Sequence, residues 1–186
     1  NYAPTAPNVQ FLAVNIPNVT AGGNISVLAP NSQAEIPAFL AGYTLALLLD
    51  EYQIGMLYPD GDPTAVAAVN AFGNGMRYYC GLCSGVYIEP ISYPTVLGIP
   101  SNEDPGKFGG YANVLINDRD VDGLYIYPSL ASDDFLSYVG TQGVLLVGTS
   151  RPEPRPGGWV MTITPDTIKA IQSAWPQLIA GQGGQN

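Results

Sequence analysis

The stretch Gln53-Ile-Gly-Met-Leu-Tyr-Pro-Asp-Gly-Asp-Pro-Thr64 decides the fold predicted for this chain. Its first half is a short apolar run, which is typical of a buried strand. Two prolines and a glycine then interrupt the strand pattern, because proline donates no ladder hydrogen bond and glycine favours a turn. Asp62 is placed to cap a helix whose first residue is Pro63. A strand, a polar loop and a helix in this order place the loop at the carboxyl end of a parallel sheet.

The same alternation continues along the rest of the chain. Short apolar runs without polar alternation predict strands, and apolar residues at helical spacing predict helices between them. The expected helices cover 34–49, 63–79, 108–117, 133–140 and 165–178, and the expected strands cover 9–14, 24–29, 52–58, 86–91, 121–127, 143–148 and 159–163. The predicted fold class is therefore α/β, with a doubly wound, mainly parallel sheet and helices on both faces.

Composition excludes several classes of function. The chain has 186 residues, a net charge of -9 and six Lys and Arg residues in all. So few basic residues argue against nucleic acid as a partner and against binding to anionic membrane surfaces. The chain contains no histidine, which excludes Ser-His-Asp and Cys-His nucleophile systems and every histidine-based metal site. Low Lys content and many Tyr, Asn, Ser and Thr residues favour an exported protein.

Cys80 and Cys83 form a Cys-x-x-Cys motif. One interpretation is a dithiol oxidoreductase, which would need the pair at a helix amino terminus. The motif instead lies at the carboxyl end of a predicted helix, and an exported protein would oxidise the pair. We therefore predict a structural Cys80–Cys83 disulfide, with the oxidoreductase kept as an alternative. A zinc site would need further Cys or His ligands, which the chain lacks.

Among the paired carboxylates, only Asp60 and Asp62 follow a predicted strand at its carboxyl end. Their two-residue spacing does not specify a catalytic pair, and it lacks the extended ligand pattern of a calcium loop. No glycine-rich turn followed by Lys-Ser/Thr indicates a phosphate-binding loop. We therefore expect no metal, no cofactor and no enzymatic activity.

Polar and aromatic residues at the carboxyl ends of successive strands are the remaining candidates. In an open α/β sheet this edge is where ligands bind. Hydroxyls, carboxylates and tyrosine rings suit a neutral polyhydroxylated or heterocyclic solute. The candidate ligand-binding residues are Tyr58, Asp60, Asp62, Ser92, Tyr127, Ser129, Thr149, Ser150 and Arg151.

Three consecutive motifs resemble a known family. Ala38-Phe-Leu-Ala-Gly-Tyr-Thr-Leu-Ala46, Tyr52-Gln-Ile-Gly-Met56 and Val69-Asn-Ala-Phe-Gly-Asn-Gly-Met-Arg77 are similar to the solute-binding lipoproteins of the basic membrane protein type, which serve ABC importers. The resemblance implies the second lobe of a type I periplasmic-binding-protein fold. It departs from the family in two ways: most of the first lobe is missing, and Thr149-Ser150-Arg151 replaces the family's usual Asp.

The resemblance implies non-catalytic capture of a small polar solute, such as a nucleoside, in an interlobe cleft. The expected partners are the missing first lobe and the permease of an ABC transporter, with homodimerisation through the exposed lobe interface as a further expectation. The expected location is extracytoplasmic, in the cell envelope, with a membrane anchor in the full-length form. The expected domains are 1–32 as a remnant of the first lobe and hinge, 33–180 as the solute-binding lobe, and 181–186 as a tail. A protein-binding α/β module is a second alternative.

Overall fold

The computed structural model of the chain describes residues 3–16, 18–28, 33–81, 87–88 and 91–184. The chain forms two compact units, one of Ala34–Thr164 and one of Asn1–Gln33 together with Pro165–Asn186. The expected boundary between the two parts was at residues 32 and 33. The division differs at 165–180, which we expected in the solute-binding lobe. A helical pattern alone does not say which strands the helix packs against.

The larger unit is built on a five-stranded sheet in which each neighbouring pair is parallel. When only the strands of this sheet are numbered along the chain, their spatial order is 2-1-3-4-5, a common doubly wound order. The α/β fold class predicted from the sequence is confirmed. In spatial order the strands are β6 (Thr95–Ile99), β3 (Ile54–Pro59), β7 (Gly123–Ile126), β8 (Leu145–Gly148) and β9 (Trp159–Thr162).

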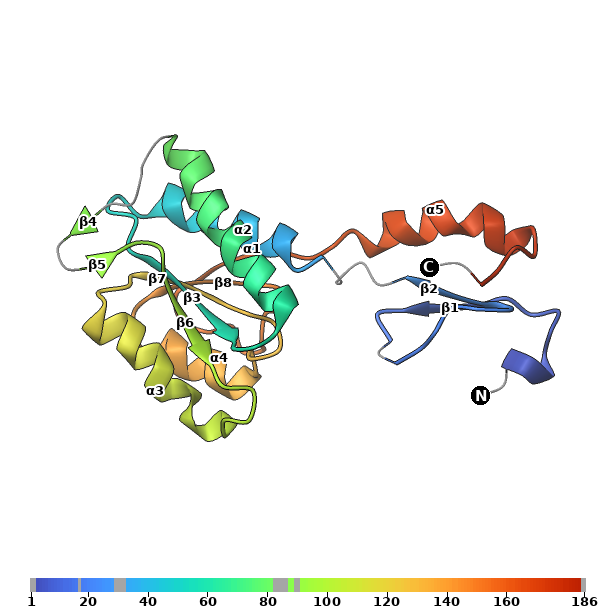
Figure 1. Cartoon of the computed structure of the whole chain (residues 1–186), viewed down its shortest axis with the longest axis horizontal. Helices are drawn as coiled ribbons and strands as arrows, with labels where there is room; N and C mark the ends of the chain where they lie inside the picture. The colour runs from blue at the N-terminus through green and yellow to red at the C-terminus, as the bar shows by residue number, and fades with distance from the viewer. Residues whose placement is uncertain (1–2, 17, 29–32, 82–86, 89–90, 185–186) are drawn as a thin grey trace. The chain divides into compact units, whose positions relative to one another are not determined.

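Helices cover both faces of this sheet (Figure 1). One face carries α1 (Glu35–Leu48) and α2 (Pro63–Cys80), and the other carries α3 (Phe108–Asn113) and α4 (Asp133–Gly140). A π-helical turn, η4 (Val114–Asp118), continues α3. Every residue of β7 is buried, as are the first four of β3, which confirms that these strands are covered on both sides.

Glycines bring α1 and α2 together on their face of the sheet. Gly42 of α1 lies against the backbone of Phe72, and Gly75 of α2 lies against the backbone of Phe39. Neither position leaves room for a side chain. The Phe72 ring then stacks on Tyr125 of β7, with the ring centroids 6.1 Å apart, so α2 is fixed over the centre of the sheet.

Of the predicted strand at 86–91, residues 86, 89 and 90 lie outside the described residues. Residues 87, 88 and 91 belong to an antiparallel pair, β4 (Tyr87–Ile88) and β5 (Ile91–Ser92), whereas the strand that pairs with β3 in the large sheet is β6, which was not predicted. The run Thr95–Ile99 lies between Pro94 and Pro100, which made it look like part of a proline-rich loop. Both prolines fall outside an edge strand, where their missing donors cost the ladder nothing.

The smaller unit contains two parallel strands, β1 (Phe11–Val14) and β2 (Ile25–Leu28), and helix α5 (Thr167–Ile179). A 3₁₀ turn, η1 (Ala3–Thr5), precedes β1. The side-chain amide of Asn24 donates to the carbonyls of Ala3, Ala6 and Val9, which ties this amino-terminal segment to β2. The α5 helix has no fully buried residue, and it exposes 56% of Trp175.

Candidate functional site

The loop after β3 forms as the sequence predicts. Asp62 caps α2, because its Oδ1 accepts a hydrogen bond of 2.8 Å from the amide of Thr64, and Pro63 is the first helical residue. Gly61 has a φ of 79°, the left-handed conformation that the turn needs. The amide of Asp60 donates to the carbonyl of Ile99 at 2.7 Å, so this residue continues the pairing with β6 beyond the strand end.

The point where the chain reverses direction across the sheet lies beside this loop. From β3 the chain moves outward to β6, and it then returns across β3 to form β7 on the other side. Ligands of open α/β sheets bind at the carboxyl ends of the strands at such a switch point. The loops that meet there are those that follow β3 and β7. The predicted residue Tyr58 lies near the end of β3, Asp60 and Asp62 lie in the loop after it, and Tyr127 and Ser129 lie in the loop after β7.

Tyr58 and Tyr127 stand on the same face of the sheet at this edge. Leu57 is in register with Ile126, and the amide of Tyr127 donates to the carbonyl of Leu57 at 2.9 Å. The next residue of each strand is a tyrosine, so Tyr58 and Tyr127 are neighbours across the two strands. Tyr125 stacks on Phe72 of α2, and Tyr127, two residues later, points to the same side. Two tyrosines on adjacent strands give the edge an aromatic component.

The charges of two carboxylates act on the Tyr127 hydroxyl. Burial raises the pKa of Tyr127 above its ordinary value, and the nearby charges of Asp62 and Glu35 raise it further. Glu35 is the first residue of α1 and Asp62 caps α2, so both of these charges come from helix amino termini. Sequence reasoning missed Glu35, because only residues at the carboxyl ends of strands were considered as candidates. A carboxylate at the start of a helix that covers the sheet was the available signal.

Gly98 of β6 gives space to the β3 residues of the site. A Cβ atom at this position would lie 3.2 Å from the ring of Tyr58 and 3.2 Å from Cβ of Asp60. Both side chains therefore extend over the edge strand. Sequence patterns did not indicate this role, because no strand was predicted at residue 98.

Ser92 does not belong to the site. Gly55, near the amino end of β3, is in register with Thr95, so Ser92 lies before the amino end of the sheet. The prediction assumed that the strand before Ser92 belongs to the large sheet, whereas the sheet strand is β6, which begins after Ser92. The loop that does follow β6, residues 100–104, reaches the carboxyl edge instead.

Thr149, Ser150 and Arg151 follow β8, as predicted, at the same edge. In the sheet β8 is two strands away from β3, a separation of about 10 Å. Arg151 is paired with Glu153 at 2.5 Å. Its charge is therefore already compensated within its own loop.

The electrostatic character of the edge follows from these pairings. Arg151 is paired with Glu153, and Lys107, in the first turn after the β6 loop, is paired with Glu103. Asp60 and Glu35 have no ion pair among the residues that the structure describes. The edge therefore offers hydrogen-bond acceptors and disfavours anions. No group of three or more His, Cys, Asp or Glu side chains in the described ranges is placed to hold a metal ion.

Cys80 is the last residue of α2, with Gly81 after it. The negative end of the helix macrodipole does not stabilise a thiolate, so this position does not favour the oxidoreductase alternative. Cys83 lies outside the described residues. The Cys80–Cys83 disulfide therefore stays a prediction.

Comparison with known proteins does not assign the chain to a family. No family model matches the chain, and no curated protein matches it either. Among the described residues, no helix combines the length and the apolar character needed to span a membrane. The function is therefore inferred from the sheet edge itself.

Proposed function

We propose that the Ala34–Thr164 unit is one lobe of an extracytoplasmic solute-binding protein of an ABC importer, similar to the basic membrane protein type. The lobe captures a small polar solute, such as a nucleoside, without chemical conversion. The observation that carries this proposal is the position of Tyr58, Asp60, Tyr127 and Ser129 at the switch point of a 2-1-3-4-5 sheet.

The chemistry of the edge supports a neutral solute that donates hydrogen bonds. Asp60 and Glu35 present carboxylate oxygens that accept such bonds, and Tyr58 supplies an aromatic ring and a hydroxyl beside the buried Tyr127. A ribose diol and a heterocyclic base together match these groups. An anionic solute would be repelled by the uncompensated carboxylates.

In this proposal a first lobe completes the site by hinge closure. One lobe supplies only part of the contacts and leaves the solute exposed to water, so this chain alone binds weakly. Homodimerisation and delivery to a permease belong to the same proposal. The exposed Ile168, Trp175 and Ile179 of α5 support an additional partner for the smaller unit.

Calorimetric titration of the chain with adenosine, guanosine, cytidine and D-ribose tests the single-lobe proposal. We expect dissociation constants above about 100 µM for every compound, because half of the contacts and the enclosed site are absent. Sodium phosphate serves as the anionic control and should give no binding heat. A submicromolar affinity for a nucleoside would contradict the single-lobe proposal.

A further inference from the structure

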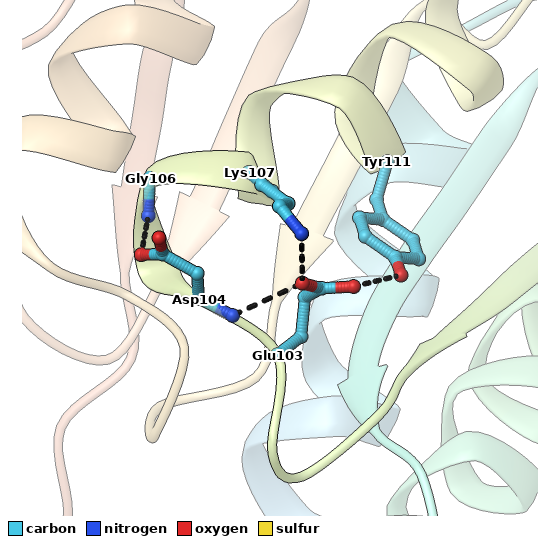
Figure 2. Close-up of polar contacts among 5 residues, drawn as sticks. All are labelled: Glu103, Asp104, Gly106, Lys107 and Tyr111. Carbon is cyan, nitrogen blue, oxygen red and sulfur yellow. Dashed lines mark hydrogen bonds and ion pairs between the residues drawn. The ribbon is translucent and has the colours of Figure 1, made fainter.

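The loop between β6 and α3 is organised around the carboxylate of Glu103 (Figure 2). Its Oε1 accepts hydrogen bonds from the amide of Asp104 and from Nζ of Lys107, each at 3.1 Å. Its Oε2 accepts the hydroxyl of Tyr111 at 2.9 Å. Three groups from the next eight residues of the chain therefore converge on one side chain. Both carboxylate oxygens are in use, so Glu103 is not itself available to a solute.

Two further bonds close the loop around this carboxylate. The amide of Glu103 donates to the carbonyl of Pro100 at 2.9 Å, which forms a turn directly after β6. Asp104 Oδ1 accepts the amide of Gly106 at 2.9 Å and caps the 3₁₀ turn η3 (Pro105–Lys107), which leads into α3. The loop is thus fixed at both ends, and its exposed tip is Ser101-Asn102.

The Ser101-Asn102 tip begins close to the β3 loop of the candidate site. The carbonyl of Ile99 accepts the amide of Asp60, so Ser101 follows two residues after a direct contact with the β3 loop. The hydroxyl of Ser101 and the amide of Asn102 are neutral groups that both donate and accept hydrogen bonds. They complement the acceptor-only carboxylates of Asp60 and Glu35.

We propose that Glu103 is a positioning residue that holds Ser101 and Asn102 as the β6-side wall of the solute site. This inference rests on the proposed function. Glu103 orders the loop, and the two neutral side chains contact the solute. An ordered wall lowers the entropy cost of binding, because the loop does not have to be fixed when the solute arrives.

The expected energetics separate this role from a general stabilising one. Glu103 and Lys107 form an i,i+4 pair in which 69% of the Lys107 side chain and 20% of the Glu103 side chain are in solvent, and ion pairs with a solvent-exposed partner contribute little to global stability. Removing the charge of Glu103 should therefore loosen the loop while leaving the unfolding midpoint nearly unchanged. Glu153→Gln is the control, because Glu153 is also paired with a cation at the same edge, although its side chain is 72% exposed against 20% for Glu103.

The test compares the full chain carrying Glu103→Gln with the wild type and with Glu153→Gln. Without solute, the amides of Asp104, Gly106 and Lys107 should exchange with solvent at least about threefold faster in Glu103→Gln only. With adenosine, wild type and Glu153→Gln should show amide shift changes at Ser101 and Asn102. In Glu103→Gln these changes should be lost, while those at Asp60 and Tyr127 remain. A Tyr111→Phe variant, which removes one of the three bonds, should show a smaller effect of the same kind.

Two outcomes would overturn the inference in distinguishable ways. Unchanged exchange in Glu103→Gln, or wild-type shifts at Asp60 and Tyr127 without shifts at Ser101 and Asn102, would reject the positioning role and leave the proposed function standing. An absence of adenosine shifts from the whole carboxyl edge would reject the proposed function and the wall with it. In that case the exchange data would still report whether Glu103 orders the loop.

Discussion

Replacing Gly42 or Gly75 with alanine should destabilise the larger unit by about 2 kcal/mol or more, although alanine is the better helix former. At Gly42 the new Cβ would lie 3.0 Å from the carbonyl carbon of Phe72 and closer still to its oxygen. At Gly75 it would lie 2.9 Å from the carbonyl carbon of Phe39. Both obstacles are backbone atoms, so no rotamer change relieves the overlap. The helices must separate, and the core between them loses its packing.

Helix propensity and steric overlap predict opposite signs here, and their magnitudes decide the outcome. A glycine-to-alanine change in a helix gains at most about 1 kcal/mol, whereas overpacking against backbone costs about 1–3 kcal/mol or more. Gly110→Ala is the matched control. Gly110 is an exposed helical glycine with no atom within 4 Å of an added Cβ, and its replacement should be neutral or stabilising. Urea unfolding of the three variants measures the effect. Equal stability of Gly42→Ala and Gly110→Ala would contradict the packing described for α1 and α2.

Tyr125→Phe should stabilise the protein by about 1 kcal/mol, because the Tyr125 hydroxyl is buried without a hydrogen-bond partner among the described residues. Burial raises the pKa of this hydroxyl well above its ordinary value, so it remains neutral at any working pH. Folding removes the Tyr125 hydroxyl from water, and no described residue replaces the hydrogen bonds that it made with water. Phenylalanine retains the ring that stacks on Phe72 and removes the desolvated oxygen.

Tyr93→Phe is the matched comparison for this prediction. Tyr93 is also buried, but its hydroxyl donates a hydrogen bond of 2.7 Å to the carbonyl of Arg119. Its replacement should therefore destabilise the protein by about 1 kcal/mol. Thermal or urea unfolding at neutral pH compares the two variants. A loss of stability in Tyr125→Phe would show that the hydroxyl has a partner, such as a buried water molecule.

Sequence patterns predicted most of the fold, because they depend on local rules. The strand, turn and helix at 53–64 follow from proline and glycine chemistry and from the cap at Asp62, and each feature is present in the structure. Helix α4 was predicted with the bounds Asp133–Gly140 that it has. The fold class follows from the alternation of such units.

The parts that sequence reasoning missed depend on which segments become neighbours. β6 was hidden between two prolines, and with it the carboxyl-edge role of Gly98 and the loop around Glu103. Ser92 was assigned to the wrong end of the sheet for the same reason. Glu35 approaches Tyr127 only because α1 packs over the sheet beside α2. No local pattern in the sequence shows which of these segments become neighbours in the fold.

Mapping of amide shifts during titration with adenosine tests the central claim most directly. The carboxyl end of the sheet carries the proposed site, and the amino end of the same sheet is the internal control. The account predicts shift changes in the loops at 58–62, 100–102, 127–129 and 149–151, and none around Asp50, Gln53 and Asp122 at the amino end. Changes confined to the amino end, or none anywhere at about 10 mM adenosine, would contradict a solute site at the carboxyl edge of this sheet.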